Sequence, residues 1–293
     1  MVFHKPVLVQ EALSFLSPSP GKTYIDATLG HGGHTLEILK KGAHTYGIDQ
    51  DKVNLKIATD RIAEEGLSQK FYPIHGNFSQ LDQIVENNIK TKVDGVIFDL
   101  GLSQSQITSQ NRGFSFNDEM SLDMRLDPEL QETTAEFIIN TASFDELYEI
   151  FTRFGQEKYA KPIVLRIIRE RQKSPIKSGK KLGDIIRNYY QTHNLKSGID
   201  PATKIFMSLR IVINQEYSNL KSALSQTLEI VKPQGIVAVI TFHSGEDRIV
   251  KQFVQSHLHQ IDNLTPKAIR STPQEVKNNP LSRSALLRSY KIK

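Results

Sequence analysis

The sequence predicts an α/β protein, a doubly wound parallel sheet into which a helical subdomain is inserted. Short apolar runs rich in β-branched and aromatic residues alternate with amphipathic helical segments, as parallel strands and their crossover helices do. Between the fourth and fifth of these runs lie more than a hundred residues whose periodicity is helical throughout. A crossover needs only about a dozen residues, so this stretch is expected to form a subdomain of its own.

Five apolar runs are expected to form the parallel strands, and an alternating segment near the C-terminus is expected to close the sheet. The runs are residues 24–29, 45–49, 71–75, 93–100 and 236–242, and the closing segment is residues 284–290. The expected helices of the insert are residues 134–139, 144–154, 163–171, 182–190 and 205–230, the last returning to the sheet from about residue 214. These elements predict a sheet domain at residues 1–108 and 212–293, and an inserted helical subdomain at residues 109–211.

A glycine-rich loop follows the first expected strand. Residues 26–34 read DATLGHGGH, and Asp49 ends the second strand. A glycine loop at the end of one strand and a carboxylate at the end of the next are what a doubly wound sheet uses to hold an adenosine-bearing ligand. The expected ligand is S-adenosylmethionine, with Asp49 accepting from both ribose hydroxyls. Its methionine end is expected to contact Asp26, Gly30, Gly32 and Gly33.

The spacing of the glycines disfavours two other classes of ligand. A dinucleotide loop, G-x-G-x-x-G/A, would place Gly or Ala where Thr35 stands, and no P-loop sequence occurs in the chain. An oxidoreductase therefore stays only as an alternative, as does an RNA-binding protein that kept the cofactor fold without catalysis. A further alternative is that Gly32 and Gly33 simply form a tight turn between strand and helix.

Composition excludes several classes of protein. The 293 residues include no Cys, which rules out disulfides and thiolate metal sites, and no H-E-x-x-H pair occurs, so no catalytic metal is expected. No apolar run approaches the length of a membrane span, and no signal peptide is visible. We expect a cytoplasmic protein that makes no membrane contact.

Basic residues are concentrated in one part of the expected insert. Eleven Lys and Arg residues against three acidic ones give residues 153–187 a net charge of +8, so the rest of the chain carries −3 of the overall +5. Such a basic island is expected of a nucleic-acid contact surface, and Arg166, Arg169 and Lys173 are its candidate RNA contacts. The alternative is a helix face that is merely solvated.

The fourth expected strand ends in a second motif that predicts chemistry. Residues 94–103 read DGVIFDLGLS, and ligands of open α/β sheets lie beyond the carboxyl ends of the strands. Asp99 and Ser103 are therefore expected to face the reacting methyl group, where hydrogen-bond acceptors would favour the pyramidal form of an exocyclic amine and orient it for attack. The alternative for Asp99 is a capping carboxylate.

Taken together, these motifs and others resemble one known family in order and spacing. They are HKPVL at residues 4–8, DATLGHGGH at 26–34, DGVIFDLGLS at 94–103, RGFSF at 112–116, LDMR at 122–125, PAT at 201–203, LRI at 209–211, FHS at 242–244, EDRIVK at 246–251 and SRSALLR at 282–288. The chain is similar from His4 to Arg288 to the bacterial small-subunit ribosomal RNA cytosine-N4 methyltransferases, the RsmH/MraW family.

The resemblance implies a Rossmann-like class I methyltransferase sheet and methylation of the exocyclic N4 amine of one cytidine in the decoding region of small-subunit ribosomal RNA. The implied cofactor is S-adenosyl-L-methionine, and the implied partner is that RNA or the assembled small ribosomal subunit; a homodimer stays open. The implied cofactor contacts are Gly32, Gly33, His34, Asp49, Phe78, Asp99 and Gln106. Phe78 would stack on adenine, although a Phe at such a position is also expected in core packing.

The resemblance also implies which segments close over the target base. They are the loop from Arg112 to Arg125, which includes Phe114, and the segment from Phe242 to Arg248, with His243 and Asp247 near the cleft. The chain departs from the family pattern at Gln104, Ser105, Met120, Ser121, Met207, Ser208 and Gly245. These departures concern the loops of the base pocket and leave Asp26, Asp49, Asp99 and Arg112 unchanged.

Overall fold

The computed structural model describes residues 6–108 and 111–293, which form two compact units. The sheet unit is the chain up to Ser103 together with Tyr217–Lys293, and the helical unit is Gln104–Glu216. Each boundary lies five residues from the one expected from sequence. His4 and Lys5 of the first family motif, and residues 109 and 110 at the start of the expected insert, lie outside the described residues.

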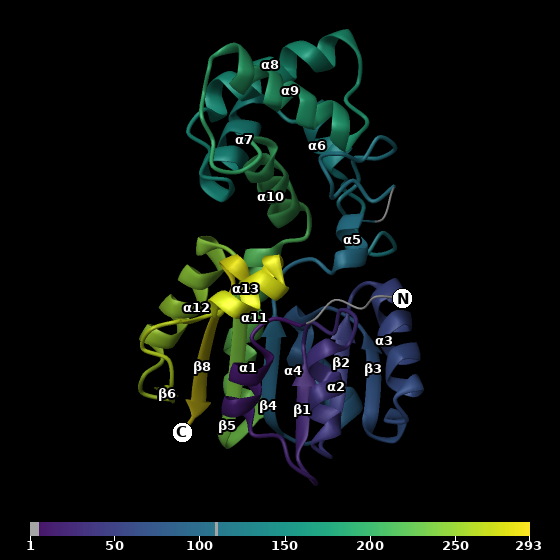
Figure 1. The fold of residues 1–293 in the computed structure, drawn as a ribbon, viewed down its shortest axis with the longest axis vertical. Helices are drawn as coiled ribbons and strands as arrows, with labels where there is room; N and C mark the ends of the chain where they lie inside the picture. The colour runs from purple at the N-terminus through teal and green to yellow at the C-terminus, as the bar shows by residue number, and fades with distance from the viewer. Residues whose placement is uncertain (1–5, 109–110) are drawn as a thin grey trace. The chain divides into compact units, whose positions relative to one another are not determined.

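The sheet unit is built on one mixed sheet with the strand order β3-β2-β1-β4-β5-β8-β6, and β7 pairs with β8 (Figure 1). The strands are β1 Thr23–Asp26, β2 His44–Asp49, β3 Phe71–His75, β4 Val93–Asp99, β5 Val231–Thr241, β6 Ile261–Asn263, β7 Ile269–Arg270 and β8 Leu286–Ile292. The first five pair in parallel, whereas β8 is antiparallel to its three neighbours. The order reverses between β1 and β4, which places the topological switch point of the sheet there.

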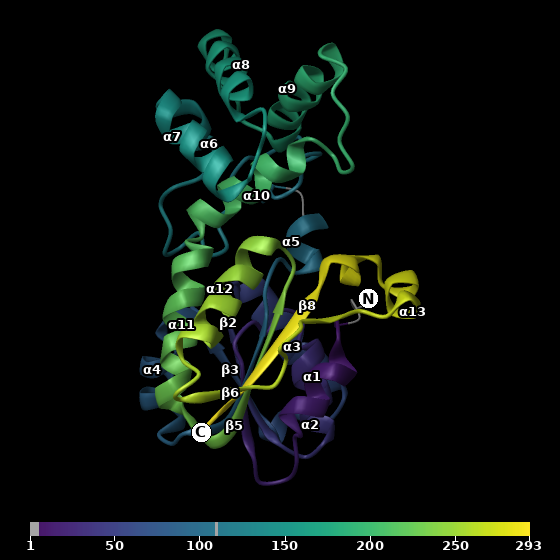
Figure 2. The ribbon, with the colours of Figure 1, turned by 90° about the vertical axis from the view of Figure 1, so that its left-hand side faces the viewer.

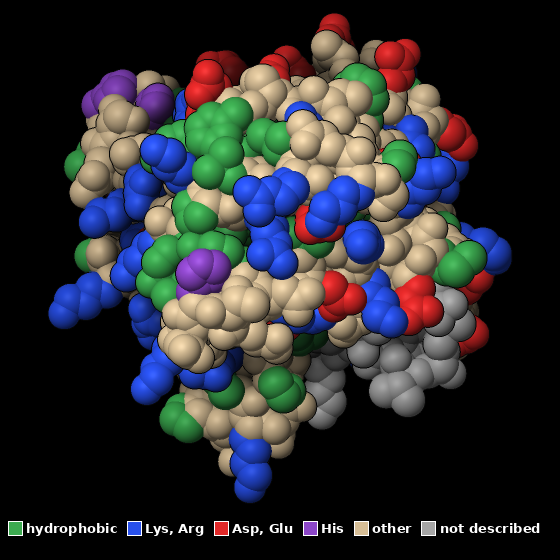
Figure 3. Space-filling view, turned by 90° about the horizontal axis from the view of Figure 1, so that it is seen from above, with side chains coloured by type: hydrophobic (Ala, Val, Ile, Leu, Met, Phe, Trp, Pro, Cys, Tyr) green, Lys and Arg blue, Asp and Glu red, His purple; other side chains and the backbone are tan. Residues whose placement is uncertain are grey.

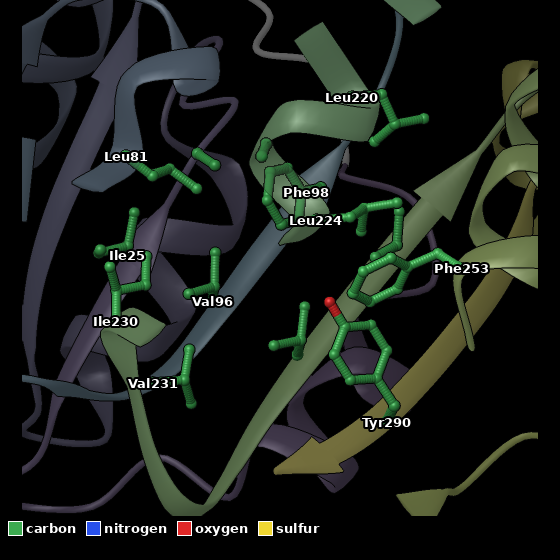
Figure 4. Packing of buried hydrophobic residues seen from close by; sticks show 14 of the residues in the cluster. Ile25, Leu81, Val96, Phe98, Leu220, Leu224, Ile230, Val231, Phe253 and Tyr290 are labelled. Carbon is green, nitrogen blue, oxygen red and sulfur yellow. The ribbon is translucent and has the colours of Figure 1, made fainter. Parts of the chain in front are cut away.

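Helices cover both faces of this sheet (Figure 2). One face packs against α4 Leu81–Ile84, α11 Glu216–Ile230 and α12 Ser244–Ser256, and the other against α1 Val9–Leu16, α2 Gly33–Lys40 and α3 Lys52–Glu64. Strand β4 contributes Val96 and Phe98 to the first face and Ile97 to the second, so it is apolar on both sides, as a buried parallel strand requires. Figure 4 shows Phe98 and Val96 among the side chains of the first face, with Leu224 and Phe253 from the helices.

The helical unit contains six α-helices within its described residues. They are α5 Gln104–Thr108, α6 Ala135–Thr141, α7 Phe144–Glu149, α8 Ala160–Lys173, α9 Gly179–Thr192 and α10 Ala202–Ile213. Three of these helices start at a side-chain cap: Thr134 caps α6, Ser178 caps α9, and Ser143 forms a reciprocal capping box with Glu146 at α7.

The helical periodicity over residues 205–230 corresponds to two helices, and the second agrees with the helix expected to return to the sheet from about residue 214. Helix α10 ends at Ile213 and α11 begins at Glu216, because Gln215 adopts a left-handed φ of 51°. Asn214 makes this break a fixed corner, since its side-chain amide donates to the Met124 carbonyl and its oxygen accepts from the Leu126 N–H, each at 2.9 Å. Periodicity alone does not reveal such a corner, because the apolar positions continue on both sides of it.

The C-terminal region contains more structure than the sequence predicted. Beyond the expected closing strand, observed as β8, the chain forms the short strands β6 and β7 and the helix α13 Pro273–Asn278. Elements of two to six residues carry too little periodicity to be recognised from sequence. Within residues 6–108 and 111–293, no helix combines the length and apolar character that crossing a membrane requires.

Candidate functional site

Two carboxylates end adjacent strands at the switch point, Asp26 on β1 and Asp99 on β4. Asp26 is 1% exposed, and its Oδ2 accepts from the Thr35 hydroxyl at 2.7 Å. Burial raises the pKa of Asp26 to about 6, although its hydrogen bonds from Thr35 and Thr28 oppose the shift. Thr35 is the residue that departs from a dinucleotide loop, and its hydroxyl anchors the acid at the end of β1.

The glycine loop packs closely on its surroundings at the start of α2. Gly32 has a left-handed φ of 73°, and a Cβ there would approach the Ala58 Cβ to 3.2 Å. A Cβ on Gly33 would lie 2.9 Å from the Pro6 ring. Both positions therefore require glycine, which leaves the backbone N–H groups at the start of α2 uncovered by side chains of their own and suited to an anionic group.

Asp49, at the end of β2, is already held by three donors of the protein. Its Oδ2 accepts from the Gly30 N–H at 2.8 Å and from Asn54 Nδ2 at 3.2 Å, and its Oδ1 accepts from the Asp51 N–H at 2.8 Å. A carboxylate offers about four lone-pair sites, so about one remains for a ligand. Burial raises the pKa of Asp49 to about 7. Acceptance from both ribose hydroxyls, as expected from sequence, would require one internal bond to open.

Ser103 belongs to the same hydrogen-bond chain. Its hydroxyl donates to Asn54 Oδ1 at 3.0 Å, and Asn54 in turn donates to Asp49. The structure therefore connects Ser103 to the expected ribose acid, and its expected place beside the reacting methyl group stays a prediction. Asn54 was not among the expected site residues. The sequence signal that could have found it is a polar residue in line with Ala58 and Ile62, which form the buried side of α3. In the structure Asn54 is 2% exposed.

Asp99 has one carboxylate oxygen near a histidine and one without a partner. Oδ2 lies 3.4 Å from Nδ1 of His34, and Oδ1 is buried with no hydrogen-bond partner among the described residues. The Asp99 N–H donates to the Thr28 hydroxyl, which fixes the backbone at the end of β4. Burial raises the pKa of Asp99 well above its ordinary value, and the negative charges of Asp26 and Glu246 add to the shift.

The His34 ring is enclosed by the protein. It is 3% exposed, and its Nε2 lies 3.0 Å from the carbonyl oxygen of Val7, so both ring nitrogens face protein oxygen atoms. Burial lowers the pKa of His34 to about 4. Because both ring nitrogens face protein oxygen atoms, we expect any cofactor contact of His34 to come from its backbone at the start of α2. The side chain lies against Asp99.

Phe78 and Gln106 lie in different units. Phe78 packs edge-on against Phe98, with ring centroids 5.9 Å apart, and contributes to the core of the sheet. Part of the Phe78 ring is therefore used in core packing, as the alternative had it. Stacking of the rest of the ring on adenine stays a prediction. Gln106, 4% exposed, lies in α5 of the helical unit.

His243 begins α12 as its N-cap. Its Nδ1 accepts from the Glu246 N–H at 3.4 Å, and Glu246 accepts in return from the backbone N–H of His243 at 3.3 Å. Asp247 receives a two-point contact from the Arg288 guanidinium, at 2.6 and 3.1 Å. Between them lies Gly245, where any Cβ would collide with the Tyr217 hydroxyl. This departure from the family pattern is therefore required by Tyr217.

The loop residues expected to bind substrate build the loop itself. Arg112 donates to the carbonyls of Arg125 and Leu126, at 3.1 and 3.3 Å, and its guanidinium lies over the ring of Phe114. The Arg125 fork holds Asp123 at 2.7 and 2.8 Å. These three expected residues therefore position the loop, and any contact with a base stays a prediction.

The basic island divides into tethered and exposed residues. Arg171 donates to two backbone carbonyls and Arg187 pairs with Asp200, so both serve the fold. Arg166, Arg169 and Lys173 lie at positions i, i+3 and i+7 of α8, which places them on one side of the helix. Arg169 and Lys173 are exposed, whereas Arg166 is half-buried. Figure 3, seen from above, shows Lys and Arg side chains spread over the surface turned to the viewer, with acidic ones between some of them.

Comparisons with solved structures agree with this fold. SMU.1697c of Streptococcus mutans, a methyltransferase candidate solved in complex with SAH, is 13% identical and has a TM-score of 0.50, with 100% of both chains covered. An rRNA-methylase candidate of Clostridium thermocellum gives the same identity, score and coverage. At this identity the likeness concerns the fold alone, a class I methyltransferase sheet.

Comparisons of sequence go further. A ribosomal RNA small subunit methyltransferase H of Persephonella marina is 39% identical over 295 residues, which are 99% of each chain. That of Thermomicrobium roseum is also 39% identical, over 98% of this chain and 92% of its own. The model of the MraW methylase family matches residues 1–293. With the glycine loop, Asp49 and Asp99 at the carboxyl ends of β1, β2 and β4, this chain belongs to the MraW methylase family.

Proposed function

We propose that this protein transfers a methyl group from S-adenosylmethionine to small-subunit ribosomal RNA, at the exocyclic N4 amine of a cytidine in the decoding region. The family and the names of the relatives support the reaction class. The observation that carries the assignment to an amine is Asp99, a carboxylate at the switch point with a buried oxygen that no described donor satisfies.

The residues around the glycine loop fit this cofactor. The start of α2 offers N–H groups to the methionine carboxylate, and Asp26 offers a negative charge to the methionine amine. Asp49 keeps about one acceptor position for a ribose hydroxyl. When bound, S-adenosylmethionine supplies an electrophilic methyl group on a cationic sulfur.

Asp99 would act on the amine rather than on the methyl group. By accepting a hydrogen bond from N4, its carboxylate favours the pyramidal nitrogen, whose lone pair is free to attack. This interaction strengthens toward the transition state, so it would raise turnover more than substrate affinity. Ser103, bound to Asn54, would order the loop that follows Asp99.

The helical unit would supply the RNA contacts. Arg169 and Lys173 on α8 are exposed cations in a region of local net charge +8. Phosphate contacts of this kind position an RNA without reading its sequence. We propose a cytoplasmic site of action, because ribosomal RNA is the substrate. The RNA partner is either naked small-subunit RNA or the assembled small subunit, and methyl transfer to each of them distinguishes the two.

The function is tested by transfer of a tritiated methyl group from S-adenosylmethionine to naked small-subunit RNA and to purified small subunits. Digestion to nucleosides should place the label in N4-methylcytidine. Asp99→Asn should lose this activity. Asp94→Asn is the matched control at the opposite end of β4, where Asp94 binds the Thr23 N–H and Lys232. Cofactor binding with no labelled RNA in either substrate would favour a non-catalytic RNA-binding protein.

A further inference from the structure

The neighbours of His34 determine which of its nitrogens carries a proton. The carbonyl oxygen of Val7, 3.0 Å from Nε2, can only accept, so Nε2 carries the proton and donates it. In the neutral ring Nδ1 is then an acceptor, and it faces Asp99 Oδ2 at 3.4 Å. The two side chains are therefore direct neighbours, at a separation somewhat longer than that of an ordinary hydrogen bond.

A neutral Nδ1 and a carboxylate oxygen both present lone pairs, so the pair is favourable only when one proton lies between them. The groups around Asp99 decide where this proton resides. Asp26 from β1 and Glu246 from α12 both add negative charge, and burial opposes a charged form of either partner. Burial and these charges raise the pKa of Asp99, and burial lowers that of His34, so both shifts favour the neutral form of the group concerned.

We infer that Asp99 and His34 form a dyad that holds one proton in the free protein, releases it when a cationic ligand binds beside Asp99, and regains one from the methylated amine. The inference rests on the proposed function. In that reaction the nitrogen–carbon bond forms as the carbon–sulfur bond breaks, and the surplus N4 proton passes to the Asp99 carboxylate. The resulting O–H group donates to Nδ1 of His34, which is a positioning residue.

The charges balance at each stage of this scheme. In the loaded site the positive sulfur is matched by the negative carboxylate of Asp99, and after transfer the thioether, the methylated base and the protonated Asp99 are all neutral. A carboxylate beside Asp26 and Glu246 is costly while it is charged and unpaired. With the dyad, the Asp99 carboxylate is charged only while the cationic ligand is bound beside it.

Proton release upon ligand binding tests the dyad without any turnover. Isothermal titration of the unmodified protein at pH 7, in buffers of different ionisation enthalpy, measures the protons released by S-adenosylmethionine and by S-adenosylhomocysteine. Both ligands carry the same ribose and amino acid, so contributions from Asp49 and Asp26 cancel in the difference. The cationic ligand should release about one proton more. Asp99→Asn should abolish this difference.

His34→Gln tests the role of Nδ1, because its amide can still donate to Val7 but offers no acceptor at the Nδ1 position. Protonated Asp99 then loses its acceptor, so the midpoint of the proton-release difference against pH should fall by roughly one pH unit. Equal proton release by the two ligands, or an unshifted midpoint in this variant, overturns the dyad. Failure of both ligands to bind would instead overturn the proposed cofactor, and the comparison of ligands needs no variant to fold.

Discussion

The hydroxyl of Thr35 donates to the carboxylate of Asp26 at 2.7 Å, and both side chains are buried. One hydrogen bond does not offset the burial of a negative charge, and the pKa of Asp26 is raised from 3.8 to about 6. The folded protein therefore binds a proton at Asp26 more tightly than the unfolded chain does. This contribution to stability is present below pH 4 and is lost as the pH rises through 6.

Asp26→Asn should remove this pH dependence. The free energy of unfolding of the wild type should fall between pH 4 and pH 7, and in the variant this fall should be smaller by up to about 3 kcal/mol. Urea unfolding at several pH values measures the difference. Thr35→Val deletes the hydrogen-bond donor of the Asp26 carboxylate. Because the charged form loses a partner, this variant should lose more stability than the wild type as the pH rises. Parallel stability curves for Asp26→Asn and wild type would show that Asp26 keeps an ordinary pKa.

Asp49→Ala should weaken S-adenosylmethionine and S-adenosylhomocysteine equally, by roughly 1–3 kcal/mol, because it removes a buried acceptor for the ribose that both ligands share. Isothermal titration measures both affinities. Asp60→Ala, at an exposed position of α3 where Asp60 pairs with Lys56, is the matched control. Unchanged affinities in folded Asp49→Ala would remove Asp49 from the cofactor site.

Asp99→Asn should reduce turnover by 100-fold or more, on the order of what a positioned acid–base group contributes, and change RNA affinity little. Single-turnover methylation and RNA binding, measured separately, give the two numbers. If turnover stays within a fewfold of the wild type, the carboxylate is a structural group and the amine finds its acceptor elsewhere.

Charge reversal of Arg166, Arg169 and Lys173 to Glu should weaken RNA binding and flatten its salt dependence. Each lost phosphate contact lowers the slope of log affinity against log salt by about 0.7–0.9. Binding titrations between 50 and 200 mM salt measure the slope, and cofactor affinity should not change. The double variant Arg169→Glu/Lys173→Glu leaves the half-buried Arg166 in place and should give most of the effect.

A control with the same change in net charge separates contact from bulk electrostatics. Lys40, Lys56 and Lys92 are exposed on the sheet unit, and their reversal to Glu should leave the slope close to that of the wild type. Equal slopes for wild type and the α8 variant would move the RNA contacts elsewhere in the chain.

Gly245→Ala should destabilise the protein by about 1–3 kcal/mol, since the new methyl group meets the Tyr217 hydroxyl. In a Tyr217→Ala background the same substitution should cost much less. Denaturant unfolding of the wild type, the two single variants and the double variant gives the interaction energy between positions 217 and 245. Additive effects would mean that Tyr217 moves aside freely.

The sequence was most informative where periodicity and end-of-strand residues coincide. All five parallel strands were expected within a few residues, except that β5 begins at Val231. Asp49 and Asp99 lie at strand ends as expected, whereas β1 ends at Asp26, earlier than the expected strand of residues 24–29. These features follow from local patterns, because a buried parallel strand is apolar on both faces and its carboxyl end leads into the ligand crevice.

What could not be predicted depends on partners distant in sequence. His34 faces Val7 and Asp99, and Ser103 reaches Asn54 across 49 positions of the chain. Arg112 and Arg125 hold the carbonyls and the acid of their own loop, a role that the sequence did not indicate, and their expected contact with substrate stays a prediction. A charged residue in a loop has the same sequence appearance whether it faces inward or outward, so only the fold distinguishes the two.

The insertion of the helical unit between β4 and β5 affects how the protein is made. The helical unit is one continuous segment, Gln104–Glu216, whereas the sheet unit needs β5 and β8, which are synthesised last. During translation the helical unit therefore emerges whole while β4 still lacks its neighbour β5. The nascent sheet therefore presents an open, apolar strand edge for the time that more than a hundred residues take to be synthesised, and such an edge is exposed to pairing with other chains.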